Sequence, residues 1–175
     1  TILFPTDFSD VAEGAFAHAA HLALQYNATI HVFNVVGPNA DESANPMDFL
    51  PVQSAEGGSS EAGQHVEVQT VTQERGTVPV VYAQTDSDSP PDAIVDRAEE
   101  QDVDLVVMGT RGRQGMNRLL SGSVSEEVVR RAPCPVFTVL AREGGAGPAI
   151  GRVLAPVDLS DQSELVLNHA AALSE

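Results

Sequence analysis

The sequence contains no lysine and no tryptophan, and it has a single cysteine among 175 residues. Cys134 has no second cysteine in the chain to pair with, and we expect it to be a small buried residue at the start of a strand. No apolar run reaches the roughly 18 residues that a membrane-spanning helix needs, and no signal peptide is visible. The sequence therefore predicts a cytoplasmic protein that makes no contact with a membrane.

Positive charge is also scarce. Nine arginines supply all of it against 25 acidic residues, which gives a formal net charge of −16. Such a charge weakens the compact state through self-repulsion, and molar salt relieves this by shortening the Debye length to about 3 Å. Together with the missing lysine, the charge predicts a halophilic protein, the alternative being a merely acidic one. Nucleic-acid binding needs a basic surface, so the composition argues against it.

Strand-like apolar runs alternate with helical patterns along most of the chain. We expect five strands, at 2–5, 29–36, 78–84, 103–108 and 135–140. We expect helices at 10–26, capped by Ser9 or Asp10, at about 89–101, and from Val124 onward. Strands that are apolar throughout, joined by helical crossovers, are typical of a parallel sheet covered on both faces. The fold class predicted is therefore α/β.

The segment between the second and third strands is harder to interpret. Residues 37–63 are polar and rich in proline, glycine and serine, which predicts a long loop. In 61–75 the valines at 66, 68 and 71 fit neither a helical nor a strand period well. Because parallel strands need a crossover connection, the context favours a helix here.

The chain contains an internal repeat. Residues 153–161 align without a gap to residues 2–10, at a constant offset of 151, and the same offset matches His169 to His18. A glycine-rich stretch precedes the repeat. We therefore expect one full domain over 1–142, a linker over 143–151, and the first strand and helix of a second copy over 152–175.

A glycine-rich stretch from Gly109 to Ser123 joins a buried strand to a helix. In an open parallel sheet, ligands bind beyond the carboxyl ends of the strands at the topological switch point. Glycines let the backbone approach an anion, and the amides of a helix N-terminus favour phosphate. Asp7 ends the first strand, which should be the neighbouring one. The stretch is neither a Walker A loop nor a dinucleotide-binding glycine motif.

Five of the nine arginines lie between 111 and 131. Arg111 and Arg113 are candidates for phosphate contact, with surface ion pairs as the alternative. We expect Arg130 and Arg131 to pair with Glu126 or Glu127 instead.

The spacing Gly109-x-x-Gly112, nine residues, Gly122-Ser123 resembles the ATP-binding motif of the universal stress protein (UspA-like) family. Residues 5–9 resemble the first-strand signature of that family. The resemblance implies an open, Rossmann-like sheet of five parallel strands in the order 3-2-1-4-5 with helices on both faces. It also implies pairing of domains through the last strand, as a homodimer or, with the second copy, as an intramolecular pseudo-dimer. The missing lysine and the tandem copy look like haloarchaeal members.

The resemblance also implies a nucleotide site. Asp7 and Val35 would hold the adenine and ribose end, Met108 and Gly109 would line the nucleotide, and the residues from Gly112 onward would contact the phosphates, with Mg²⁺ or Mn²⁺ as a common companion. The implied set is Pro5, Thr6, Asp7, Val35, Met108, Gly109, Arg111, Gly112, Gly122, Ser123, Val124 and Ser125.

Three functions remain open from the sequence. The preferred one is an ATP-binding stress-response protein that acts through nucleotide-dependent conformation or partner choice. A weak ATPase or phosphotransfer enzyme is the rival, although no general base is evident and turnover should be feeble. An interaction module with a relic site is the third. His18 and His21 could share a metal, but without an apparent third ligand we expect them to be ordinary helix-surface histidines.

Overall fold

The computed structural model describes residues 1–37, 52–54, 59–61, 64–73, 76–110, 124–140, 152–158, 160 and 162–173. The chain divides into two compact units, Thr1–Glu143 and Gly144–Glu175. Among the described residues, no helix is long and apolar enough to cross a membrane.

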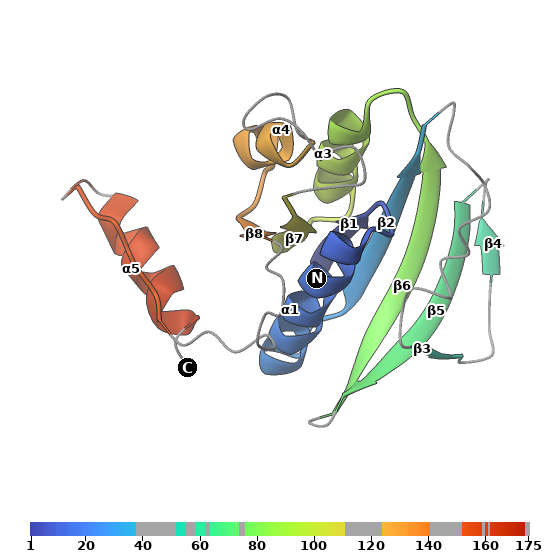
Figure 1. The fold of residues 1–175 in the computed structure, drawn as a ribbon, viewed down its shortest axis with the longest axis horizontal. Helices are drawn as coiled ribbons and strands as arrows, with labels where there is room; N and C mark the ends of the chain where they lie inside the picture. Colours follow the sequence, from blue (N-terminus) through green and yellow to red (C-terminus); the bar gives the residue numbers. More distant parts are fainter. Residues whose placement is uncertain are drawn as a thin grey trace. The chain divides into compact units, whose positions relative to one another are not determined.

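The first unit is built on five parallel strands (Figure 1). They are β1 (Ile2–Thr6), β2 (Ile30–Val36), β6 (Gly76–Asp86), β7 (Leu105–Gly109) and β8 (Val136–Val139). Their spatial order is β6-β2-β1-β7-β8, which is 3-2-1-4-5 when these five are counted along the chain. The predicted order is confirmed. The order reverses between β1 and β7, so the topological switch point lies at their carboxyl ends.

Helix α1 (Asp10–Tyr26) covers one face of this sheet, as Figure 1 shows. The predicted bounds and cap are confirmed, because the Ser9 side chain accepts a hydrogen bond of 3.4 Å from the Ala12 amide. The helix ends at Asn27, whose left-handed conformation suits a C-cap. The face of α1 that meets the sheet is apolar, and Phe16 packs edge-on against Phe4 of β1 at 5.3 Å between ring centroids.

The other face carries α3 (Pro90–Glu100) and α4 (Val124–Arg131). Side chains alternate along a strand, so Leu3 points away from α1 while Phe4 points toward it. Leu3 is fully buried in a cluster with Phe33 of β2, Ile94 of α3 and Val128 of α4. Helices on both faces, as predicted, therefore enclose two apolar layers that fix the strand ends in place.

The helix predicted for 61–75 is wrong. Residues Gln64–Gln73 form strand β5, which pairs antiparallel with β6, with Gln73 opposite Gly76. The segment is rich in valine and threonine, whose branched side chains favour strands, and an antiparallel neighbour needs no crossover helix. The crossover expected for a purely parallel sheet thus misled the sequence interpretation.

The predicted loop over 37–63 also contains structure. Short strands β3 (Val52–Ser54) and β4 (Ser59–Glu61) both pair with β5. The parallel sheet therefore continues beyond β6 as an antiparallel extension (Figure 1). The remainder of 38–63 lies outside the described residues.

The second unit contains helix α5 (Gln162–Ala172). The strand predicted at its start is absent, since residues 152–158 have no strand pairing. A strand exists only with a neighbour to satisfy its backbone groups. Leu154 is accordingly 90% exposed, whereas Leu3, its match at the repeat offset, is 0% exposed between β2 and β7.

Candidate functional site

The candidate site lies where β1, β2 and β7 end. The strands run parallel with β1 in the middle, so the residues that follow them meet at one edge of the sheet. The described members of the predicted set are Pro5, Thr6, Asp7, Val35, Met108, Gly109, Val124 and Ser125. The others, Arg111, Gly112, Gly122 and Ser123, lie outside the described residues, as does Arg113.

The turn after β1 is held by its own side chains. The Phe8 amide donates to Thr6 Oγ1 at 3.0 Å, and the Ser9 amide donates to Asp7 Oδ1 at 3.1 Å. Pro5, Thr6 and Ser9 are buried, while Asp7 is exposed. The turn thus fixes one oxygen of the Asp7 carboxylate and presents the group at the surface, where a ligand hydroxyl could reach it.

Phe8 has a left-handed backbone conformation, with φ of 55°. This region is unfavourable for a bulky side chain, so the turn stores strain. The Phe8 ring lies 6.4 Å from that of Tyr82 on β6. Burial raises the pKa of Tyr82 to about 12, and its hydroxyl donates to Gln84 Oε1 at 2.8 Å. An aromatic pair therefore supports the strained turn.

Asn34 is a site residue that the sequence analysis missed. It lies on β2 directly opposite Thr6, and its Nδ2 donates to the Thr6 carbonyl at 2.8 Å. Both side chains are buried, with 9% of Asn34 and 8% of Thr6 exposed. A buried carboxamide needs a partner, but the partner of Asn34 is revealed only by the strand register, so the sequence offered no clear signal. Val35, the next residue, is half-buried.

The end of β7 packs tightly against α1. Met108 is 5% exposed and belongs to the core, so it would offer a ligand its backbone. A Cβ at Gly109 would lie 2.9 Å from Val11 Cγ1, in the first turn of α1. Gly109 therefore has a packing reason in the structure, in addition to the ligand approach predicted from its place in the sequence. The close approach also brings the end of β7 near the helix that follows the Asp7 turn.

The start of α4 places Val124 and Ser125 at the far side of this edge. Val124 is half-buried against the core, and Ser125 is 7% exposed. The first turn of the helix carries Glu126 and Glu127, which favour the positive end of the helix dipole.

The arginines at the end of α4 make surface ion pairs, as predicted. Arg130 lies 3.3 Å from Glu126, and Arg131 lies 3.9 Å from Glu127. Arg131 also lies 2.6 Å from Asp92 at the start of α3. The Ser89 side chain, and then Arg131, lower the pKa of Asp92. These bonds link α3 to α4 and leave the two arginines with protein partners.

The histidine pair on α1 shows no sign of a metal site. The described residues contain no group of three histidines, cysteines or acidic residues that could hold a metal ion. The His18 ring instead lies 5.9 Å from Phe137 of β8. Burial, and then the charge of His21, lower the pKa of His18. His18 therefore packs against the last strand rather than standing free on the helix surface.

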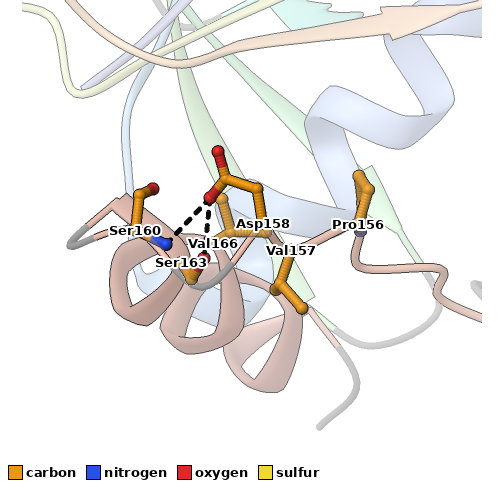
Figure 2. Close-up of a pocket in the computed structure, with 6 residues that line it drawn as sticks. All are labelled: Pro156, Val157, Asp158, Ser160, Ser163 and Val166. Atoms are coloured by element: carbon orange, nitrogen blue, oxygen red, sulfur yellow. Dashed lines mark hydrogen bonds between the residues drawn. The ribbon is translucent and has the colours of Figure 1, made fainter.

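The second unit repeats the Asp7 turn (Figure 2). Asp158 Oδ1 accepts hydrogen bonds from the Ser160 amide at 3.0 Å and from Ser163 Oγ at 3.2 Å. The first bond matches the one between Asp7 and Ser9. Hydrogen bonds, first from the Ser160 side chain, lower the pKa of Asp158. The hollow in Figure 2 is formed within this unit, by Pro156, Val157, Asp158, Ser160, Ser163 and Val166.

The fold defines an open α/β protein in which the order of the parallel strands reverses between β1 and β7, beside Asp7. A match to the universal stress protein family covers residues 1–139. A universal stress protein of Methanocaldococcus jannaschii is 34% identical over 144 residues, which span 79% of this chain and 80% of that protein. The chain belongs to the universal stress protein family.

Solved structures show the same fold. A universal stress protein from Archaeoglobus fulgidus matches with a TM-score of 0.55 and 26% identity, over 78% of this chain and 43% of that chain. A universal stress protein in complex with cAMP matches with a TM-score of 0.54 and 23% identity, over 79% of this chain and 94% of that chain.

Proposed function

We propose that this protein binds an adenine nucleotide, ATP, beyond the carboxyl ends of β1 and β7 and acts as a nucleotide-dependent stress-response module. One observation carries the proposal. The turn that presents Asp7 and the glycine that ends β7 lie at the switch point of the sheet, on either side of the first turn of α1. In open parallel sheets this crevice is where ligands bind.

Each described group has a role in such a site. The exposed Asp7 carboxylate would accept hydrogen bonds from ribose hydroxyls, while Val35 offers half-buried apolar surface to the base. The end of β7 would supply backbone groups at Met108 and Gly109. The first turn of α4, at Val124 and Ser125, would direct amides and the positive end of its dipole toward phosphate.

The segment joining β7 to α4 would complete the phosphate site. It contributes Arg111, Gly112, Gly122 and Ser123, whose spacing matches the ATP-binding motif of the family. The universal stress protein that carries cAMP has this fold, so an adenine nucleotide is compatible with it.

A divalent ion would enter this site as a companion of the nucleotide. Within the described residues no group of three protein ligands could hold a metal alone. Mg²⁺ is commonly bound by substrate phosphates together with one or two carboxylates, so the ion would arrive with the phosphates. The ion would neutralise phosphate charge, which matters in a chain with a net charge of −16.

Calorimetry on the whole chain tests the proposal. ATP should bind the wild-type protein in molar KCl, and Gly122→Val should abolish binding because a branched side chain would crowd the phosphates. Gly14→Ala is the control, since Gly14 is an exposed residue of α1 outside the proposed site and a Cβ there meets nothing within 4 Å. A folded Gly122→Val protein with wild-type affinity for ATP would refute the phosphate assignment.

We also propose that β8 is the edge through which domains pair. It is the last strand of the described sheet, its residues are half-buried or exposed, and Leu140 after it is 52% exposed. An open edge of this kind invites another strand. A homodimer, or a pseudo-dimer with a complete second copy, would cover it.

A further inference from the structure

We propose that Asn34 is a positioning residue of the nucleotide site, which holds the turn that presents Asp7. That the site binds a nucleotide rests on the proposed function, but the effect of Asn34 on the turn does not. Asn34 would not touch the nucleotide. It acts through the Thr6 carbonyl, the last backbone acceptor of β1 before the chain leaves the sheet.

The hydrogen bond from Asn34 to Thr6 lies in buried surroundings, where its loss would be costly. Asn34 Nδ2 donates to the Thr6 backbone carbonyl at 2.8 Å, and both residues are at least nine-tenths buried. A hydrogen bond in such surroundings is stronger than one in water, and leaving the buried carbonyl without its partner is costly. The neighbouring strand thus fixes the peptide immediately before Asp7.

The turn needs this anchor because it is strained. Phe8 has a φ of 55°, a region that bulky residues rarely adopt. Such a conformation persists only where its surroundings over-determine it. Among the bonds that hold this turn are those from Asn34 to the Thr6 carbonyl, from the Phe8 amide to Thr6 Oγ1, and from the Ser9 amide to Asp7 Oδ1. Two of them come from the turn itself, and Asn34 ties it to β2.

The chemistry of asparagine suits this position. A carboxamide donates to the carbonyl without placing a charge near the Asp7 carboxylate. A lysine or arginine could donate as well, but it would form an ion pair that competes with the ligand for Asp7. The neutral donor therefore adds no competing charge beside the exposed carboxylate while it fixes the backbone that carries it.

The test compares two substitutions on the same strand of the whole chain. Asn34→Ala removes the anchor, whereas Val32→Ala removes fully buried methyl groups two residues earlier on the same face. Both variants lose stability, and both are measured at a temperature where they are folded. Asn34→Ala should weaken ATP binding by about tenfold or more, as expected for a lost buried hydrogen bond, while Val32→Ala should change it by less than about twofold.

A second measurement needs no nucleotide. Hydrogen exchange of the ligand-free protein should speed up at the Phe8 and Ser9 amides in Asn34→Ala and stay close to wild type elsewhere. A further comparison checks the strain. Glycine adopts a positive φ without cost, so Asn34→Ala should weaken ATP binding less in a Phe8→Gly background than in the wild type.

The outcomes separate the two proposals. A wild-type protein that binds no adenine nucleotide overturns the proposed function, and the exchange measurement still decides the role of Asn34. Unchanged exchange at Phe8 and Ser9 in Asn34→Ala overturns the positioning role. So does an ATP affinity equal to that of Val32→Ala in a wild-type protein that binds ATP.

Discussion

Gly109 at the end of β7 lies so close to Val11 in the first turn of α1 that a Cβ at position 109 would be 2.9 Å from Val11 Cγ1. The next nearest atoms are the Val11 carbonyl oxygen and carbon, at 3.4 and 3.5 Å. The strand that ends at the candidate site and the helix that follows the Asp7 turn are therefore fitted to each other. This contact couples packing to the geometry of the site.

Gly109→Ala should destabilise the protein by roughly 1–3 kcal/mol, as overpacked cores do. The cause would be the steric conflict with Val11, because the remaining contacts are ordinary. Val11→Ala in the same chain should then restore much of the lost stability. Denaturant unfolding of the two single variants and the double variant measures the coupling. Additive losses would contradict the contact as the cause.

The net charge of −16 leads to a second prediction. Thermal stability should rise steeply with KCl up to molar concentration, because salt screens the repulsion among the acidic residues. A melting temperature measured across this range decides the question. If it stays flat from low to molar salt, the halophilic interpretation fails.

The third prediction is that the protein loses stability in mild acid because of His31. Its Nδ1 is buried without a hydrogen-bond partner among the described groups, and burial, followed by the charges of Arg97 and the N-terminus, lowers its pKa from 6.5. The folded state therefore resists a proton that the unfolded state accepts. The contribution of His31 is complete above pH 6.5 and decreases as the pH falls from there through the lower folded-state pKa.

Denaturant unfolding in molar KCl, measured from about pH 7.5 to about pH 5, would test this effect, because histidine changes its charge in this pH range. His31→Gln keeps a polar group of similar size but cannot titrate, so its stability should depend less on pH than that of the wild type. His18, whose pKa is also lowered, should contribute in the same direction. Identical pH dependence in wild type and His31→Gln would exclude His31 as a source.

The sequence predicted the parallel sheet because the signals there agreed. Apolar runs, helix caps at Ser9 and a proline at the start of α3 all indicated alternating strands and helices, and the order was confirmed. In β5 the signals conflicted. Valine at 66, 68 and 71 breaks the alternation partway, and the expected crossover decided wrongly between helix and strand.

The residues of the candidate site likewise divide into those that the sequence predicts and those that it does not. Asp7 could be found because it follows a strand at a predicted switch point. Asn34 could not, because its role depends on lying opposite Thr6, and only the strand register shows that. The packing reason for Gly109 depends likewise on α1 reaching across to β7. Contacts between distant segments, rather than local patterns, carry these parts of the site.

The β8 edge gives the last prediction. Pro135 and Val139 turn their carbonyls toward β7, where they accept from the Val106 and Thr110 amides at 3.0 Å each. Backbone groups alternate along a strand, so those of Thr138 point away from β7, toward the open edge. A partner strand would use the Thr138 amide, and proline at this position cannot donate it.

The 175-residue chain should therefore form homodimers at high micromolar concentration in molar KCl, and Thr138→Pro should be monomeric. Thr138→Val is the matched control, because it keeps the amide and the branched shape of an exposed side chain and should leave the dimer intact. Light scattering gives the masses, starting from 18.4 kDa for the monomer. In a longer chain with a complete second copy, tethering would favour pairing within the chain over pairing between chains. A strictly monomeric wild type, or a dimeric Thr138→Pro, would rule out β8 as the pairing edge.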